Sequence, residues 1–157
     1  MNQTTSPAAP RLFAQPLKSW ERAALKSALG KAGLPTADIE VPEHLFWRFE
    51  TDEEMPVGFG GLELHGSDAL LRSVVVLPPL RRRGFGASIV AALETEAALH
   101  HCGAIWLLTE SATAFFDRLG FAGCDRAVVP EAIRATQEFA ALCSPGAHIM
   151  LKMLKRL

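Results

Sequence analysis

Hydrophobic residues near the start of the chain follow the spacing of a helix. From Ser19 to Ala32 they recur every three or four positions, beginning at Trp20, and so define one apolar face. Ser19 is a candidate N-cap, because its hydroxyl can accept a hydrogen bond from the first helical turn, and Gly33 is a stop signal. The pattern therefore predicts a helix over this segment, with a further helical turn over Thr36 to Glu40.

The spacing then changes to that of strands joined by short turns. Leu45 to Glu50, Val57 to His65 and Leu70 to Leu77 are apolar segments separated by an acidic turn and a glycine-containing turn. The third segment is almost wholly apolar, as a strand covered on both faces should be. Together the three predict an antiparallel meander, and Arg11 to Ala14 predicts a short first strand.

A helical face returns after the third strand of the meander. Phe85, Ile89, Leu93 and Ala97 share that face, and Ala104 to Leu108 is a short apolar strand beyond it. Strand, helix and strand in this order indicate a parallel crossover unit. The remaining predicted elements are a helix over Ser111–Leu119, a strand over Ala122–Val129, a helix from Glu131 to about Leu142 and a strand over His148–Leu154.

Length and composition agree with this pattern of elements. The chain has 157 residues, which is enough for one domain with a single core. Hydrophobic residues make up 49% and charged residues 21%, which argues against intrinsic disorder. Residues 1–10 are polar and proline-bearing without periodicity, so we expect a disordered tail there and a single domain over residues 11–157.

Charge and cysteine content exclude several classes of function. A net charge of −1 gives no overall footprint for nucleic acid or for an acidic membrane. No uncharged run approaches the roughly 20 residues of a membrane-spanning helix, and the first residues do not resemble a signal peptide. Three cysteines without C-x-x-C spacing argue against a disulfide framework and the common zinc sites. We therefore expect a cytoplasmic protein with no metal.

The segment from Val76 to Ala87 carries the clearest chemical signal. It joins a buried strand to a helix and contains Gly84 and Gly86, where the backbone can approach a ligand closely. Free N–H groups at a helix N-terminus bind anionic oxygens, and the arginines at 81–83 add positive charge. The segment is neither a Walker loop nor a complete G-x-G-x-x-G motif. These features predict a phosphate site, with a solvated basic turn as the alternative.

Two motifs give the chain a family resemblance. Val76-x-Pro78-x-x-Arg81-x-x-Gly84-x-Gly86 resembles the acetyl-CoA loop of the GNAT N-acetyltransferases, and Ala112-x-x-Phe115-Phe116-x-x-Leu119-Gly120-Phe121 resembles a later segment of that superfamily. Within it, Leu70 to Val76 and the late segment Ala132 to Ala140 look most like the small acetyltransferases associated with arsenic-resistance genes. It is also similar to the acetyltransferase domain of N-acetylglutamate synthases.

The resemblance implies both a fold and a reaction. The fold is α/β: a mixed, mostly antiparallel sheet of about six or seven strands flanked by helices, with the parallel strand–helix–strand unit at the cofactor loop. The implied reaction is acetyl transfer from acetyl-CoA to the amine of a small, amino-acid-like acceptor by direct attack. Alternatives are a sensor that binds acetyl-CoA or a metabolite without turnover, and acetylation of a protein or peptide amine. A homodimer is also allowed, since dimers are common in this superfamily.

The resemblance also assigns the cofactor side of the site. The pyrophosphate is expected on the N–H groups of residues 82–87, and the pantetheine arm along the strand at residues 74–76. Thr109 stands where many members have Asn, and Phe116 is expected to line the site. The cofactor-binding residues so implied are Val74, Val75, Val76, Arg81, Arg82, Arg83, Gly84, Phe85, Gly86, Ala87, Thr109 and Phe116.

Candidates for the acceptor side come from strand alternation. Side chains alternate along a strand, so Glu63 and His65 share one face, near Arg72 on the neighbouring strand. Glu63 is the candidate catalytic base, directly or through water, and an ion pair with Arg72 is the alternative. A buried guanidinium needs a partner, so Arg72 is expected to bind either a substrate carboxylate or Glu63. Ser73 is assigned to the acceptor with Arg72.

The aromatic content departs from the family pattern. The chain has nine Phe and three Trp but no Tyr. Many relatives place a Tyr where this chain has Phe116, and that phenol is thought to protonate the departing CoA thiolate. Phenylalanine cannot donate a proton, so water or another group must do so here, or the thiolate leaves unprotonated. This departure is the main argument for the sensor alternative.

Overall fold

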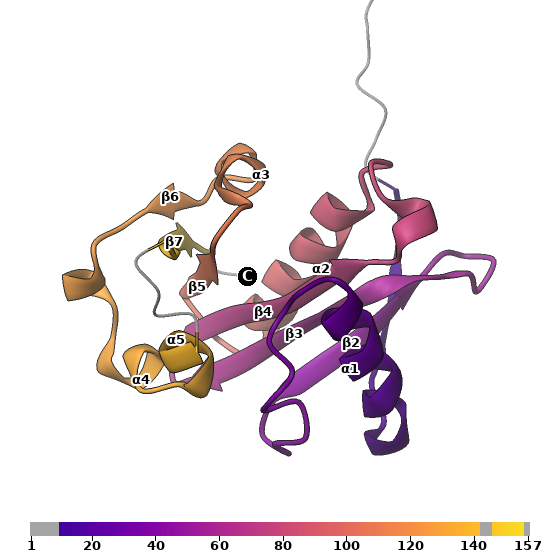
Figure 1. Ribbon diagram of the computed structural model, residues 1–157. Coiled ribbons are helices and arrows are strands. Elements are labelled where there is room, and N and C mark those ends of the chain that lie inside the picture. Colours follow the sequence, from indigo (N-terminus) through magenta and orange to yellow (C-terminus); the bar gives the residue numbers. More distant parts are fainter. Residues whose placement is uncertain (1–9, 142–145, 156–157) are drawn as a thin grey trace, which may run out of the picture.

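A computed structural model describes residues 10–141 and 146–155 of the chain (Figure 1). Apart from Pro10, the tail predicted over residues 1–10 lies outside the described residues, as does Leu142 at the end of the last predicted helix. Within the described part, strands form one sheet in the order β1-β2-β3-β4-β5-β7-β6. The strands are β1 (Phe13–Pro16), β2 (Leu45–Glu50), β3 (Pro56–His65), β4 (Asp68–Val76), β5 (Ala104–Thr109), β6 (Ala122–Gly123) and β7 (His148–Met153).

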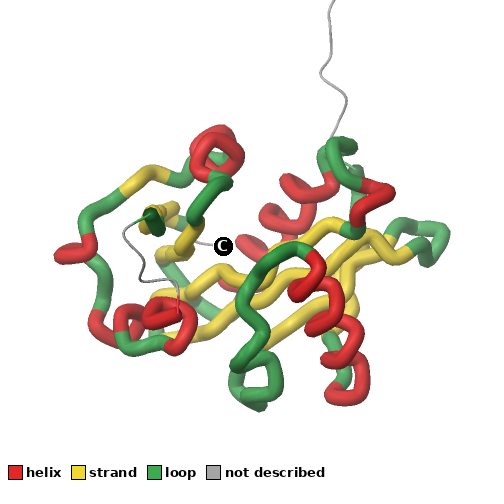
Figure 2. Tube along the Cα trace, viewed as in Figure 1, coloured by secondary structure: helices red, strands yellow, loops and turns green. Residues whose placement is uncertain are grey.

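Pairing within the sheet is antiparallel except at one place. β4 and β5 run parallel and are joined by α2, and the other neighbouring strands run antiparallel. This confirms the predicted mixed, mostly antiparallel sheet with one parallel crossover unit. The helices are α1 (Arg22–Lys31), α2 (Phe85–Leu99), α3 (Thr113–Arg118), α4 (Glu131–Arg134) and α5 (Gln137–Ala141), with 3₁₀ turns at Ser19–Glu21, Pro78–Leu80 and Arg126–Val128 (Figure 2).

Alternation along the strands divides the core between the two faces of the sheet. On one face Leu62 and Leu71 pack against α2. On the other face Phe46 and Phe59 pack against α1, while α4 and α5 cover the neighbouring strands around Trp106. A fully buried leucine or phenylalanine contributes about 1.5–3 kcal/mol, so these contacts fix the helices on the sheet. None of the described helices has the length and apolar character needed to cross a membrane.

The start of the chain differs from the predicted helix in two respects. Residues 19–21 form a 3₁₀ turn with Lys18 at the cap position, so Ser19 is not the N-cap. Because a 3₁₀ turn has fewer residues per turn, Trp20 leaves the apolar face, is 74% exposed and lies over the Lys18 ammonium. The turn predicted over Thr36 to Glu40 is not helical. The guanidinium of Arg22 donates hydrogen bonds to the carbonyls of Ile39, Val41 and His44 and holds this segment in an irregular conformation.

Two later predictions are also corrected. The strand predicted over Ala122–Val129 ends at Gly123, because the Asp125 carboxylate accepts a hydrogen bond from the Ala127 N–H and starts a 3₁₀ turn. The helix predicted from Glu131 is broken into α4 and α5. Thr136 is responsible, since its hydroxyl donates to the carbonyl of Ile133 and accepts from the N–H of Phe139. These breaks place α5 against the site described below.

A bulge and an early divergence of strands shape the middle of the sheet. β4 and β5 pair only over Asp68–Leu70 and part beyond that point. On the other side of β4, Gly60 faces both Ser73 and Val74, and Ser73 has a left-handed φ of 59°. A β-bulge re-aims the side chains that follow it, and here Val74 joins the face of α2 while Val75 joins that of α1. The divergence opens the sheet where the site lies.

Candidate active site

A pocket of about 230 Å³ fills the space where β4 and β5 part; we call it the inner pocket. Its walls come from the segment 32–35 after α1, from both strands, from the segment 110–112 after β5, and from α3 and α5. The polar side chains that line it include Arg72, Ser73, Thr109 and Glu138, and Phe116 supplies an apolar wall. The sheet therefore presents charged groups inside a small pocket rather than on an open surface.

A second pocket, which we call the outer pocket, measures about 680 Å³ and follows the loop before α2. Both pockets are lined by Val74, Ala112 and Phe116, so they adjoin each other. Among the described residues, the outer lining includes the cations Arg81, Arg82 and Arg118 and no carboxylate. The outer pocket is thus suited to an anionic ligand whose far end reaches the inner pocket.

Local sequence explains the shape of the loop. Gly84 is the N-cap of α2 with a left-handed φ of 81°, which glycine adopts without a Cβ clash. A Cβ at Gly86 would lie 3.2 Å from the Phe115 ring, so glycine lets α3 approach the loop closely. Arg81 donates from Nε to the carbonyl of Val76 and ties the loop to β4. The first N–H groups of a helix have no partner inside it, so α2 can offer them to an anion.

Most residues predicted for the cofactor gather along these pockets. Those lining the outer pocket are Val74, Val76, Arg81, Arg82, Gly84, Phe85, Gly86, Ala87 and Phe116. Thr109 lines the inner pocket, and its hydroxyl accepts a hydrogen bond from the Ala112 N–H just before α3. Val75 lies on the face of α1 because of the bulge, and Arg83 is not among the lining residues of either pocket.

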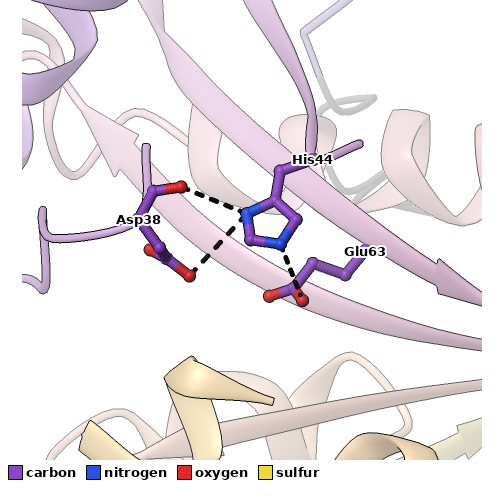
Figure 3. A group of neighbouring side chains, drawn as sticks. All are labelled: Asp38, His44 and Glu63. Atoms are coloured by element: carbon purple, nitrogen blue, oxygen red, sulfur yellow. Dashed lines mark hydrogen bonds and ion pairs between the residues drawn. The ribbon is translucent and has the colours of Figure 1, made fainter. Parts of the chain in front are cut away.

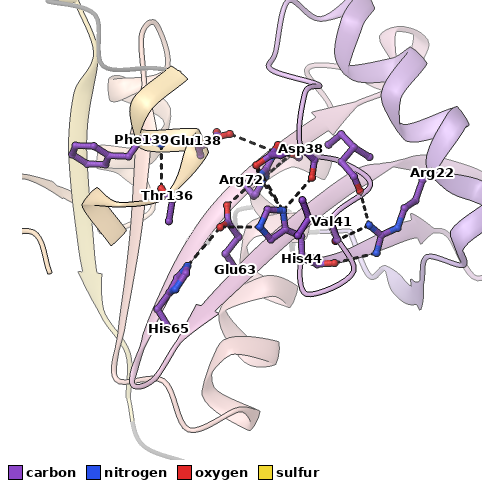
Figure 4. A network of polar contacts seen from close by, with 12 residues as sticks. Arg22, Asp38, Val41, His44, Glu63, His65, Arg72, Thr136, Glu138 and Phe139 are labelled. Carbon is purple, nitrogen blue, oxygen red and sulfur yellow. Dashed lines mark hydrogen bonds and ion pairs between the residues drawn. The ribbon is translucent and has the colours of Figure 1, made fainter. Parts of the chain in front are cut away.

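Arg72 is the centre of a buried polar cluster (Figure 4). Nη1 and Nη2 of Arg72 donate to the two carboxylate oxygens of Asp38, each at 2.5 Å. Nη1 also donates to Oε2 of Glu63 at 3.0 Å, and Nη2 lies 3.5 Å from Oε2 of Glu138. The three carboxylates belong to the segment before β2, to β3 and to α5. One guanidinium thus joins parts of the chain that are far apart in sequence.

His44 extends the cluster beside Asp38 and Glu63 (Figure 3). Its Nε2 lies 3.1 Å from Oε1 of Glu63, and its Nδ1 lies 3.7 Å from Oδ2 of Asp38. By donor type and spacing these three side chains could hold a small metal ion. Both carboxylates, however, accept hydrogen bonds from Nη1 of Arg72, so this guanidinium supplies the positive charge at this point.

Burial and charge shift the proton affinities of the cluster in different directions. Burial alone would raise the pKa of Asp38, but the hydrogen bonds and charge of Arg72 hold that pKa below its ordinary value. Burial raises the pKa of Glu138 to about 7, with further help from the charges of Asp38 and Glu63 and against the charge of Arg72. Near neutral pH, Glu138 therefore exchanges between its acid and its carboxylate.

The ion pair that the sequence offered as an alternative for Glu63 and Arg72 is present. Glu63 is 3% exposed and lines neither pocket, and His65 lies 3.5 Å from its Oε1 on the same face. Arg72 and Ser73 do line the inner pocket, and Nε of Arg72 donates to the Ser73 hydroxyl. The alternation argument thus placed Glu63 and Arg72 side by side correctly.

Sequence reasoning missed Asp38, His44 and Glu138. Asp38 and His44 lie in an irregular segment, where no periodicity marks which side chains turn inward. Glu138 lies on a one-turn helix whose start depends on Thr136, and its burial has no local signal. The only available hint was the unpaired charge of Arg72, because a buried guanidinium requires carboxylates from somewhere in the fold.

Phe116 occupies the junction of the two pockets. Its ring is nearly buried and packs edge-on against Phe115 and Phe121, with centroid distances of 5.0 and 5.5 Å. An edge-to-face triplet of this kind fixes the ring position without any polar group. The junction therefore has an apolar wall at this point.

Comparison with protein families gives one match. The model of the acetyltransferase (GNAT) family matches residues 11–121, which include β1 to β5, α2 and α3. The matched span contains the whole outer pocket and most of the inner pocket, but not Glu138. No curated protein sequence matches the chain.

Solved structures share the fold at low sequence identity. N-acetylglutamate synthase from Neisseria gonorrhoeae, complexed with coenzyme A and L-arginine, is 17% identical with a TM-score of 0.75 over 94% of this chain, which spans only 34% of that protein. Rv2747 from Mycobacterium tuberculosis, in complex with CoA and NLQ, is 23% identical with a TM-score of 0.73, covering 91% of this chain and 99% of that one. The ribosomal-protein-S18-alanine N-acetyltransferase from Escherichia coli is 17% identical with a TM-score of 0.68, covering 94% and 96%.

Proposed function

The chain belongs to the GNAT acetyltransferase family, and from this we propose that it transfers the acetyl group of acetyl-CoA to the amine of a small acceptor. The observation that carries the proposal is the pair of adjoining pockets. An arginine-lined outer pocket beside the N-terminus of α2 meets a small polar inner pocket at Val74 and Phe116. This arrangement can hold a phosphate-bearing donor on one side and its acceptor on the other.

The outer pocket fits the CoA moiety in shape and charge. The N–H groups at the start of α2 and the side chains of Arg81 and Arg82 would hold the phosphates. Between residues 71 and 76, the side of β4 that faces β5 has no partner in the described sheet, so its backbone can pair with the pantetheine arm. When bound, acetyl-CoA supplies an acetyl group activated as a thioester. An N–H of this stretch of β4 would polarise the thioester carbonyl.

The size of the inner pocket supports a small acceptor. At about 230 Å³ it lies below the roughly 300–1,000 Å³ typical of sites for drug-sized ligands, so an amino-acid-like amine suits it. Structures similar in fold contain N-acetyl-glutamate or L-arginine, which are amino-acid-like ligands. Under this proposal Arg72 and Ser73 form part of the acceptor wall. An arsenic-containing amino acid is one candidate, from the resemblance to acetyltransferases of arsenic-resistance genes.

The chain's own residues must also manage the protons. An ammonium ion is not a nucleophile, so a base must remove a proton before the amine attacks the acetyl carbon. Glu63, the base suggested by the sequence, would need a water molecule to reach the inner pocket, because its carboxylate faces Arg72, His44 and His65. Phe116 gives the junction of the two pockets an apolar wall but has no proton to donate, so the thiolate would receive its proton from solvent or leave as an anion.

The test is a screen for acetyl transfer by liquid chromatography. The protein is mixed with acetyl-CoA and a panel of glutamate, aspartate, other amino acids, their analogues and short peptides, and free thiol is measured in parallel. Acetylation of a small amine with equal release of thiol is the expected result. Binding of acetyl-CoA without thiol release for any amine would contradict the proposal and favour a sensor, whereas acetylation of peptides alone would favour a protein acceptor.

The arginines of the loop provide a prediction about the outer pocket. We expect Arg82→Ala to weaken CoA binding about tenfold or more, because a hydrogen bond to a charged group contributes about 1.5–3 kcal/mol. Arg83→Ala removes the same charge from a side chain outside the pocket lining and serves as the matched control, with a smaller loss. Isothermal titration calorimetry with CoA at two salt concentrations measures both. Equal losses would show that only the overall charge of the loop matters.

A further inference from the structure

Glu138 is a buried carboxylate in the lining of the inner pocket, and one of its oxygens has no hydrogen-bond donor among the described residues. Glu138 is only 6% exposed, although it lines the inner pocket. Among the described residues, Oε2 accepts no hydrogen bond, and its ion-pair partner Arg72 lies 3.5 Å away (Figure 4). A buried carboxylate oxygen without a hydrogen bond costs free energy, so this oxygen is a candidate for a donor that arrives with the ligand.

The charges around Glu138 leave the cluster short of positive charge. The groups that act on Glu138 are Arg72 on β4, Asp38 in the segment before β2, and Glu63 on β3. Glu63 is itself in contact with His44 and His65. Glu110, the residue after β5, is a further acid in the pocket lining. Arg72 gives its closest contacts to Asp38 and Glu63. A second cation placed in the inner pocket would therefore find Glu138 available.

We propose that Glu138 is the catalytic base: its Oε2 binds the ammonium group of the acceptor and takes a proton from it. This inference rests on the proposed function and adds a residue beyond the span that the family model matches. It identifies the acceptor as a primary or secondary amine that enters as its ammonium ion. A neutral amide or a quaternary ammonium compound would not satisfy the site, because neither brings a proton that can move to Oε2.

The proposed step balances with the groups present. One proton moves from the ammonium nitrogen to Oε2 of Glu138, which leaves a neutral amine and a neutral carboxylic acid. The nitrogen lone pair then forms the bond to the acetyl carbon as the carbon–sulfur bond breaks, and CoA leaves with that electron pair as a thiolate. The second nitrogen proton passes to the thiolate or to water. Product release returns the proton of Glu138 to solvent.

Position distinguishes Glu138 from Glu63 for this role. Glu63 accepts from Arg72, pairs with two histidines and lines neither pocket, so its oxygens are already engaged. Glu138 lines the pocket that Phe116 and Val74 connect to the donor side. Its pKa of about 7, raised by burial, also suits a base, since the carboxylate is present above that pH and holds a proton readily.

The kinetic test compares four variants at three carboxylates over pH 5.5–9, with acetyl-CoA and the amine most rapidly acetylated by the wild type. Wild-type kcat/KM should rise through about pH 7 as Glu138 ionises. Glu138→Gln should lower kcat/KM about 100- to 10,000-fold and abolish that rise, and Glu138→Asp should restore part of both. Glu131→Gln removes an exposed carboxylate from neighbouring α4 and should change neither. A rise that persists in Glu138→Gln and disappears in Glu63→Gln would overturn the proposal in favour of Glu63.

A second measurement does not depend on turnover. It follows the glutamate carboxyl carbons by ¹³C NMR in labelled protein saturated with CoA. The resonance that disappears in both Glu138→Gln and Glu138→Asp belongs to Glu138, and in the wild type it should titrate near pH 7. Methylammonium should lower that midpoint by about one unit, whereas tetramethylammonium, which has no N–H, should not. A midpoint unchanged by methylammonium overturns the role of Glu138. If the midpoint moves but no amine in the panel is acetylated, Glu138 binds an amine and it is the proposed function that fails.

Discussion

Replacing Arg72 with Met is expected to lower the free energy of unfolding by about 3–5 kcal/mol at neutral pH. The side chain is fully buried and faces Asp38, Glu63 and Glu138. Methionine fills a similar volume but leaves these carboxylates without their cation in a site from which water is largely excluded. Breaking a buried pair on one side is strongly destabilising for this reason. Urea denaturation followed by circular dichroism measures the loss.

The free energy of unfolding that Arg72→Met loses should increase with pH. Without Arg72 the pKa values of Asp38 and Glu138 rise, so the folded variant binds protons that the unfolded chain does not hold at the same pH. Its stability therefore falls as pH increases, and its deficit relative to wild type should be smaller at pH 5 than at pH 8. A deficit that is constant over this range would contradict the electrostatic explanation.

A surface arginine provides the matched control. Arg48 pairs with Glu21 and Glu50, and its side chain is 34% exposed. Exposed pairs contribute about 0–1 kcal/mol, so Arg48→Met should cost little. Arg72→Lys keeps the charge but loses the paired hydrogen bonds to Asp38, and we expect an intermediate loss. Losses of equal size for Arg72→Met and Arg48→Met would show that the buried cluster does not stabilise the fold.

Gly58→Ala is expected to impair both folding and CoA binding. Gly58 lies opposite Val76 in the β3–β4 pair, and a Cβ there would clash with the carbonyl oxygen of Val75. Because the obstacle is backbone, the two strands must separate, at a cost of about 1–3 kcal/mol or more. The displaced stretch contains Val74 and Val76, which line the outer pocket, so the CoA affinity should fall with the stability.

Thermal denaturation and calorimetric titration with CoA test Gly58→Ala. The control is Gly103→Ala, since a Cβ at Gly103 meets no atom within 4 Å and the residue lies at the opposite end of the β4–β5 pair. This control should stay within about 0.5 kcal/mol of wild type and bind CoA equally well. Wild-type CoA binding by a Gly58→Ala protein of reduced stability would show that the edge of β4 is not part of the donor site.

Prediction from sequence succeeded where the signal was local. The changes in hydrophobic spacing located the strands β2 to β5 and helix α2 to within a few residues, and their order identified the parallel crossover. Gly84, Gly86 and the arginines before them marked the loop, because the conformational freedom of glycine and positive charge are properties of single residues. Errors fell on Trp20, on Ala122–Val129 and on the helix from Glu131. In each of them a side-chain hydrogen bond or a 3₁₀ turn overrode the periodicity.

The sequence by itself therefore determined the main strands of the sheet, the crossover and the position of the glycine- and arginine-containing loop before α2. Tertiary structure alone decided the inner pocket and the charged cluster beside it. The bulge at Ser73 and the parting of β4 from β5 create the inner pocket, and only folding brings Asp38, Glu63 and Glu138 to Arg72. The physical reason is the range of the interactions involved. Helix and strand spacing and loop conformation depend on neighbouring residues, whereas burial and the balance of charge around a guanidinium depend on residues that the chain brings together from distant positions.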